Sequence, residues 1–260
     1  MFEVIQSQVI ERIHAPDLAS FYDCYVKRSI PVIIKGIVEE WPAYRKWSLE
    51  YIAQKYGDQP VGFMQVFDGH TDPDTFTEDS KKWVKLRDII SDLNKTPTKV
   101  VATPTSSFGD NFWKDIYLPP FCKKGMFLRS RIYIGASSVS TSLHQDLPEN
   151  LYATVFGKKQ IILFPPSDRK YLYPNHFFSR HPNFARFNPL QPDYHNFPLA
   201  KKSHPVEIIL QAGEILFIPS LWWHYIRNLE TSAAVNFWWN VGWKVLPAWG
   251  MAKIKKLING

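Results

Sequence analysis

Three residues that lie far apart in the chain have the types and spacing of a metal site. His144 and Asp146 form a His-x-Asp pair, and His224 follows much later. In an extended segment side chains alternate between two faces, so His144 and Asp146 point the same way. A third ligand from a distant strand would complete a set of two imidazoles and one carboxylate. This set leaves three coordination positions open and is typical of non-haem iron(II) oxygenases, because a keto acid needs two positions and dioxygen needs one.

The distal histidine, His224, is the main evidence for this hypothesis. A His-x-Asp tripeptide arises often by chance. Taken alone, His144 is equally well read as a metal ligand and as an ordinary histidine, either on the surface or in the core with hydrogen-bond partners. His224 follows the apolar run 215–218 and lies between Trp223 and Tyr225. A buried imidazole in such a setting needs a partner. A metal ion would supply one.

The elements that would position these residues are mostly short strands. Segments rich in β-branched and aromatic residues, separated by Gly, Pro and Asn, predict strands at 127–134, 150–156, 159–164, 206–210, 214–218, 223–227 and 232–239. Short strands at this spacing are typical of a sandwich or a barrel. The connection 174–205 is long and rich in Pro, Asn, His and Phe, and long loops in compact domains are often functional.

The first part of the chain shows helix and strand signals in turn. Asp17 precedes apolar residues at helical spacing, and Ser48 begins a second helix that would end near Gly57. Strands are expected at 30–36 and around 60–67, and a third helix around 82–94.

The composition is that of a globular protein without a membrane partner. Hydrophobic residues make up 45% of the 260 residues, and aromatic residues make up 15%, which favours sheets. Cys24 and Cys122 are too isolated to predict a disulfide framework or a cysteine zinc site. No apolar run is long enough for a membrane span, and the first residues lack a signal-peptide layout. We therefore expect a cytoplasmic location, or a nuclear one in a eukaryote.

Six segments resemble, in order and spacing, the small hydroxylases of the JmjC/cupin type. That family includes the asparaginyl hydroxylase that inhibits hypoxia-inducible factor and related lysyl and arginyl hydroxylases. The segments are 143–151, 157–159, 163–168, 212–219, 222–224 and 235–238, and residues 47–51 extend the likeness. The resemblance implies a mainly β fold with flanking helices, namely a double-stranded β-helix (jelly roll). It also implies an Fe(II)- and 2-oxoglutarate-dependent dioxygenase that converts 2-oxoglutarate to succinate while it hydroxylates a C–H bond.

The resemblance assigns roles to single residues. The family's iron ligands match His144, Asp146 and His224, and the residues of its 2-oxoglutarate pocket match Thr141, Asn150, Lys159 and Asn236. Lys159 would pair with the distal carboxylate, since an inward ammonium is costly unless it meets an anion. The ordinary interpretations remain open: a strand Thr, a solvated Lys, and Asn side chains tied to the backbone. Of Lys158 and Lys159, one should face the interior.

One position departs from the family pattern. Relatives place a Tyr near the turn after an N-terminal strand, where its phenol contacts the 2-oxoglutarate carboxylate, and His70 occupies that place here. The contact is thus lost, replaced by His70 or supplied elsewhere. Arg131 and Tyr133 share one face by alternation and, with Trp238, are candidates for the substrate mouth. For any single Trp, a packed core position is the commoner role.

These expectations define one domain and three functions. Residues 1–260 would form a single JmjC/cupin-like domain with an N-terminal α/β section (1–125), a jelly-roll core (126–240) and a helical tail (241–260). The leading hypothesis is hydroxylation of a protein or peptide substrate. Hydroxylation of RNA or a modified nucleotide is the alternative, since a wybutosine hydroxylase shares the architecture and the net charge is +7. A non-catalytic cupin-type binding protein is a third hypothesis, which the full ligand set disfavours. The sequence leaves the oligomeric state open, and a homodimer through the tail is one alternative.

Overall fold

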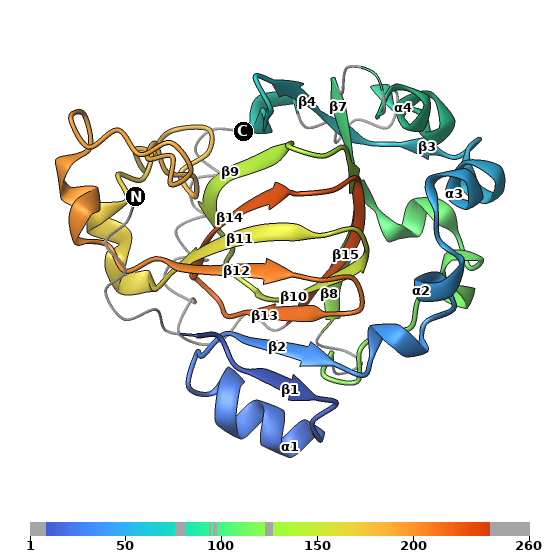
Figure 1. Ribbon diagram of the computed structural model, residues 1–260, viewed down its shortest axis with the longest axis horizontal. Coiled ribbons are helices and arrows are strands. Elements are labelled where there is room, and N and C mark those ends of the chain that lie inside the picture. Colours follow the sequence, from blue (N-terminus) through green and yellow to red (C-terminus); the bar gives the residue numbers. More distant parts are fainter. Residues whose placement is uncertain (1–8, 76–81, 94, 96–97, 123–126, 240–260) are drawn as a thin grey trace.

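The computed structural model describes residues 9–75, 82–93, 95, 98–122 and 127–239, and its centre is a barrel of strands (Figure 1). Thirteen strands of this part form one continuous sheet that folds over into two facing halves. In order, the first half is β1 (Arg12–His14), β2 (Val32–Lys35), β13 (Ile215–Ile218), β10 (Glu149–Phe156), β15 (Ser232–Trp239), β8 (Phe127–Gly135), β7 (Lys99–Pro104) and β4 (Phe63–Phe67). The second half is β5 (His70–Thr71), β9 (Ser140–Gln145), β14 (Trp223–Asn228), β11 (Lys159–Phe164) and β12 (Val206–Leu210). The expected mainly β jelly roll is confirmed.

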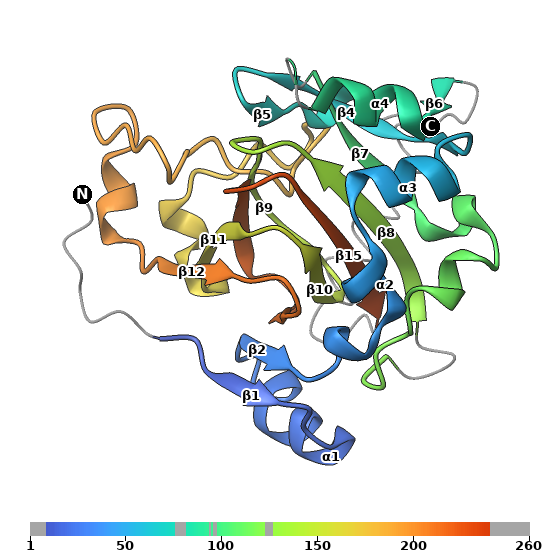
Figure 2. The same ribbon diagram turned by 45° about the vertical axis from the view of Figure 1, so that its right-hand side comes forward.

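Helices flank the sheet. They are α1 (Leu18–Phe21), which continues as a π turn η1 (Tyr22–Val26), α2 (Pro42–Lys46), α3 (Leu49–Tyr56) and α4 (Leu86–Leu93). The 3-10 turns are η2 (Val38–Glu40), η3 (Pro73–Thr75), η5 (Thr105–Phe108), η6 (Phe112–Lys114), η7 (Pro166–Tyr171) and η8 (Pro198–Lys202). Helices α2, α3 and α4 lie on one side of the barrel, whereas the connection after β11 lies on the opposite side (Figure 2). None of the described helices is long and apolar enough to cross a membrane.

The predicted helix starts are confirmed by their caps. The side chain of Asp17 accepts a hydrogen bond from the Ser20 N–H, and that of Ser48 accepts one from the Tyr51 N–H. Each cap satisfies an N–H group that the first helical turn leaves without a partner. The third helix begins later than predicted, at Leu86, because Val84 and the next residue pair with β3 (Pro60–Val61) as the strand β6 (Val84–Lys85).

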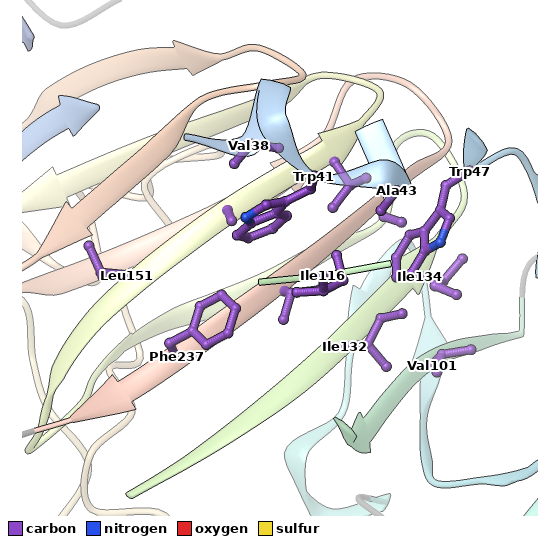
Figure 3. Packing of buried hydrophobic residues seen from close by; sticks show 14 of the residues in the cluster. Val38, Trp41, Ala43, Trp47, Val101, Ile116, Ile132, Ile134, Leu151 and Phe237 are labelled. Carbon is purple, nitrogen blue, oxygen red and sulfur yellow. The ribbon is translucent and has the colours of Figure 1, made fainter. Parts of the chain in front are cut away.

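Alternation along the strands separates an outer core from an interior. In β10, Leu151 packs into the cluster beneath the flanking helices, while Tyr152 packs into the barrel interior. Figure 3 shows the outer cluster, in which the Trp41 ring meets the Phe237 ring edge-on with centroids 5.9 Å apart. The helices therefore cover the outer face of this half of the sheet, and the inner face is left to form a site.

A buried carboxylate ties α3 to the turn after η6. Asp115 is 2% exposed, and it accepts hydrogen bonds from Lys55 Nζ at 2.8 Å, Tyr56 Oη at 2.9 Å and Trp47 Nε1 at 3.1 Å. Burial raises the pKa of Asp115, but these donors outweigh it and hold the pKa below its ordinary value. The carboxylate is therefore ionised and paired in the folded protein.

Replacing Asp115 by Ala should lower the free energy of unfolding by roughly 2–4 kcal/mol, because these three donors and the Tyr51 hydroxyl lose their acceptor. Urea denaturation measures this loss as a lower midpoint. Asp110→Ala, at an exposed position nearby, is the matched control and should leave the midpoint unchanged. Equal midpoints for both variants would contradict a structural role for the cluster.

The predicted helical tail and the predicted homodimer through it fall on residues 241–260, outside the described residues. The division of the chain into three sections stays a prediction.

Candidate metal centre and the pocket beside it

Two adjacent strands and the turn after one of them bring the predicted metal ligands together. His144 on β9 lies opposite His224 on β14, and their ring centroids are 4.1 Å apart. Asp146 follows directly after β9, and its Oδ2 lies 3.8 Å from Nε2 of His224. One ligand atom from each of the three side chains lies within 4.8 Å of the others. Three residues that are far apart in the sequence thus form a compact group of metal-binding side chains.

Backbone carbonyls fix which nitrogen of each imidazole is available. Nδ1 of His144 lies 2.8 Å from the carbonyl oxygen of Ser142, and Nδ1 of His224 lies 3.1 Å from that of Trp222. Since a carbonyl only accepts, each Nδ1 carries the proton and donates it. The lone pair is then on Nε2, as in metal-binding histidines whose other nitrogen donates to a backbone carbonyl.

The protonation states also suit a metal. Burial, together with the neighbouring His144, lowers the pKa of His224, so its imidazole is neutral at neutral pH. Burial raises the pKa of Asp146, but His224, His144 and a hydrogen bond from Trp238 outweigh it and lower the pKa overall. Neutral imidazoles and an ionised carboxylate are the forms that bind cations. Two nitrogens and one oxygen in this arrangement fit Fe(II).

A bulge in β9 lets one strand serve two parts of the site. Residues His144 and Thr141 pair with His224 and Ile226, so three steps along β9 match two steps along β14. The extra residue brings Thr141 to the same side as His144 despite their odd spacing. The bulge also contains Ser142, whose carbonyl accepts the His144 hydrogen bond.

A pocket in the barrel is lined in part from β9 and β14, the two strands that carry His144 and His224. Among the residues that line it are Thr71, Tyr133, Thr141, Tyr152, Lys159 and Asn228. Thr141 and Lys159, which the resemblance assigns to 2-oxoglutarate, therefore share one pocket. Asn150 and Asn236 are both buried but do not line it. The Asn236 side chain accepts a hydrogen bond from the Arg131 N–H, whereas Oδ1 of Asn150 has no partner among the described residues.

Lys159 is the inward member of the lysine pair. It is 2% exposed, and its Nζ donates to Oδ1 of Asn228 at 2.6 Å and to Oγ of Ser232 at 2.9 Å. Lys158 instead faces outward and pairs with Glu230 at 2.9 Å. Within the described part of the chain no carboxylate pairs with Lys159, and burial lowers the pKa of its ammonium to about 7. A buried ammonium without a carboxylate partner favours the binding of an anion beside it.

His70, which stands at the place of the family's Tyr, does not line the pocket. Its Nδ1 lies 2.7 Å from Oγ of Ser140, whereas its neighbour Thr71 does line the pocket. Two phenols, those of Tyr133 and Tyr152, line the pocket from the other half of the sheet. The tyrosines that share the pocket with Lys159 therefore come from β8 and β10, and their role toward 2-oxoglutarate stays a prediction.

The open end of the site contains aromatic and cationic side chains. Nε1 of Trp238 donates to Oδ2 of Asp146 at 2.9 Å, and the guanidinium carbon of Arg131 lies 6.0 Å from the Trp238 ring. From the connection 174–205, Phe184 stacks on the His144 ring with centroids 5.0 Å apart. Of the three residues predicted for the mouth, Trp238 contacts Asp146, Arg131 lies beside the Trp238 ring, and Tyr133 lines the pocket.

Several residues of the site were not found from the sequence. They are Thr71, Tyr152, Phe184, Asn228 and Ser232. Alternation carries a signal for two of them, because Asn228 shares the inner face of β14 with His224 and Tyr152 shares that of β10 with Asn150. No pattern in the sequence predicts that Phe184 reaches His144, because that contact depends on the course of the connection.

Comparison with known proteins gives a consistent match along the chain. Residues 18–242 match the family model of the cupin-like domain. A lysine-specific demethylase 8 from Xenopus tropicalis is 30% identical over 246 residues, which cover 89% of this chain and 53% of that protein. The human bifunctional peptidase and (3S)-lysyl hydroxylase JMJD7 is 25% identical, with 87% of this chain and 82% of that protein covered. The tRNA wybutosine-synthesizing protein 5 of Gallus gallus is 28% identical, with coverages of 87% and 74%. The chain spans little more than half the length of the demethylase.

Proposed function

The chain belongs to the cupin-like domain family of JmjC oxygenases, and from this membership we propose that it is an Fe(II)- and 2-oxoglutarate-dependent dioxygenase that hydroxylates a protein side chain. The observation that carries the proposal is the meeting of His144, Asp146 and His224 in a barrel whose interior also holds the buried ammonium of Lys159. A non-catalytic binding protein of this fold would not need a cation beside three metal-binding side chains.

Each residue of the site has a task in this proposal. His144 and His224 hold Fe(II) through Nε2, and Asp146 holds it through its carboxylate. Bound iron and 2-oxoglutarate together supply the oxygen activation that accompanies decarboxylation to succinate. Lys159 and Thr141 bind the distal carboxylate of 2-oxoglutarate, because both line the pocket beside the ligands. Burial lowers the pKa of Lys159, so its amine releases a proton easily. A bound 2-oxoglutarate carboxylate favours the charged ammonium again, because it supplies an anionic partner.

The surroundings of the site favour a polypeptide as the substrate. The connection 174–205 reaches the site through Phe184, which stacks on His144 and so forms one wall of the entrance. Such a rim suits an extended peptide. Human JMJD7, one of the relatives, is named as a lysyl hydroxylase. A nucleotide site would need stacking aromatics together with a continuous basic track for phosphates.

Hydroxylation of RNA is the second candidate. A tRNA wybutosine-synthesizing protein is among the relatives, and the formal net charge of this chain is +7. The basic residues nevertheless occur in short pairs along the whole sequence, such as Lys201 and Lys202. This scatter supports the protein substrate.

The protein, incubated with Fe(II), 2-oxoglutarate and cell extract, should add one oxygen atom to at least one peptide, which mass spectrometry detects. RNA from the same incubation is digested to nucleosides and examined in parallel. An oxygen gained by a nucleoside and by no peptide would replace the protein substrate with RNA. The Asp146→Asn variant, which keeps the shape of the side chain and removes its charge, serves as the inactive control.

A further inference from the structure

We propose that Arg129, Arg131 and Trp238, here called the arginine–tryptophan cluster, bind an acidic side chain of the polypeptide substrate close to the residue that is oxidised. This inference rests on the proposed function, because it places the cluster at the entrance to that same site. It narrows the substrate to peptides with Asp or Glu next to the reacting position.

Alternation along β8 places the cluster on the inner face of the sheet. Arg129, Arg131 and Tyr133 point to one side of this strand, and Tyr133 lines the pocket that also contains Lys159. The arginines therefore face the barrel interior, and Arg129 lies opposite Trp238 in the pairing of β8 with β15. Arg129 is exposed, whereas Arg131 and Tyr133 are half-buried. The face thus leads from solvent toward the pocket, with Arg129 outermost.

The cluster lies one aromatic ring away from a predicted metal ligand. The guanidinium carbon of Arg129 is 4.6 Å from the centre of the Trp238 ring, and that of Arg131 is 6.0 Å away. The same ring donates its Nε1 hydrogen to Oδ2 of Asp146. A side chain bound at the arginines is therefore held close to the position where a C–H bond would be oxidised.

Arg129 has the properties of a binding residue rather than of a structural one. Some arginines in the described part of the chain are held in ion pairs, such as Arg12 with Glu214 and Arg87 with Asp58. No ion pair involves Arg129 within the described residues. A guanidinium held against an indole keeps its N–H donors for a planar acceptor such as a carboxylate. The pair Arg129 and Trp238 thus presents a pre-positioned cation at the entrance.

The charge of the cluster also argues against a basic substrate. Two guanidinium groups at one entrance repel a Lys or Arg side chain, and like charges across an interface suppress the wrong partner. A carboxylate gains charge-assisted hydrogen bonds instead, and Arg is suited to bind it with two of them. Two arginines suffice for one acidic side chain, whereas a nucleic-acid strand would need a longer series of cations.

The test is equilibrium binding of two pools of fluorescent peptides of equal length, one with Asp and Glu and one with Lys and Arg at the varied positions. The protein is loaded with Mn(II) and an unreactive 2-oxoglutarate analogue, so that no turnover is needed. The acidic pool should bind at least about tenfold more tightly, the size of one charge-assisted hydrogen bond. Arg129→Glu should reverse the preference, and Arg129→Gln should remove about tenfold of the affinity for the acidic pool.

Arg45→Glu on α2 is the matched control, because this exposed arginine lies on the outer side of the sheet and should leave the preference unchanged. Unfolding midpoints show that each variant is folded. The proposal is overturned if the wild type prefers the basic pool, binds neither pool or binds a random RNA oligomer more tightly than the acidic pool. It is also overturned if Arg129→Glu keeps the wild-type preference.

Oxygen transfer is measured separately from binding. An acidic preference without any oxidised peptide in the extract would leave the cluster's role intact and contradict the proposed function. Oxidised peptides without Asp or Glu near the modified residue would support the proposed function and contradict the cluster's role.

Discussion

Replacing Asp146 by Ala should abolish 2-oxoglutarate turnover and lower the affinity for Mn(II) or Fe(II) by about a hundredfold or more. The two imidazoles that remain come from paired strands and lie side by side, so they hold an ion from one direction only. The lost carboxylate is also the only negative charge among the three ligands, and its removal leaves two neutral donors for a divalent cation.

Calorimetric titration with Mn(II) measures the affinity, and succinate formation measures turnover. Asp146→Asn tests the charge alone, because it keeps the volume of the side chain and an acceptor for Trp238 Nε1. Asp110→Ala controls for the loss of a carboxylate elsewhere. Turnover at the wild-type rate in both Asp146 variants would show that the metal is held by other residues.

Replacing Lys159 by Met should stabilise the protein and at the same time weaken its binding of 2-oxoglutarate. Burial lowers the pKa of this ammonium from the ordinary 10.5 to about 7, so at neutral pH and below the folded protein contains a costly buried charge. A thioether of similar volume avoids that cost but leaves Asn228 and Ser232 without their donor. The net gain in the free energy of unfolding should be roughly 1–3 kcal/mol near pH 6.

The pH dependence distinguishes this mechanism from simple repacking. Between about pH 7 and pH 10 the unfolded chain keeps the lysine proton that the folded protein has released, so wild-type stability rises with pH in this window. The advantage of Lys159→Met should therefore shrink as the pH rises through this range. Urea denaturation at several pH values measures it, and Lys158→Met at the exposed neighbour is the control.

The same variant should lose 2-oxoglutarate binding by about one to two powers of ten while its Mn(II) affinity changes little, since Lys159 contacts no predicted metal ligand. Parallel losses of both affinities would point to a general change in the barrel. A wild type that is more stable than Lys159→Met near pH 6 would contradict the buried-charge account.

Much of the fold could be predicted because local signals and pairing agree. The strands from β10 to β15 follow runs of β-branched and aromatic residues, and α3 begins and ends at its predicted residues, Ser48 and Gly57. Other strands form because they pair with neighbouring strands, not because of their own residue types. Strand β9 is rich in Ser and Thr and was predicted only as an extended segment, and β5 is held by parallel pairing with β9. The expected strand around 60–67 is divided at Gly62, which donates to Oγ1 of Thr103.

The site could be predicted as far as its residues act through type and spacing. His144, Asp146 and His224 carry that signal, and the structure brings them together. The residues that accept hydrogen bonds from Lys159 could not be found in this way. Asn228 lies opposite Lys159 only because of the register between β11 and β14, and Ser232 lies nearby because β15 begins there. That register depends on packing across the whole barrel.

The bulge in β9 makes the strand change phase inside the site. Before it, the inward side chain has an odd number, at Thr141, and after it an even number, at His144 and Asp146. Thr141 and His144 are an odd number of positions apart, and only the bulge lets their side chains share one face. Removing the bulge without changing the length of the chain would turn either Thr141 or His144 to the other face, since three steps along a regular strand reverse the side. A chain shorter by Ser142 would instead keep both side chains on one face without a bulge, so the odd spacing and the bulge are needed only together.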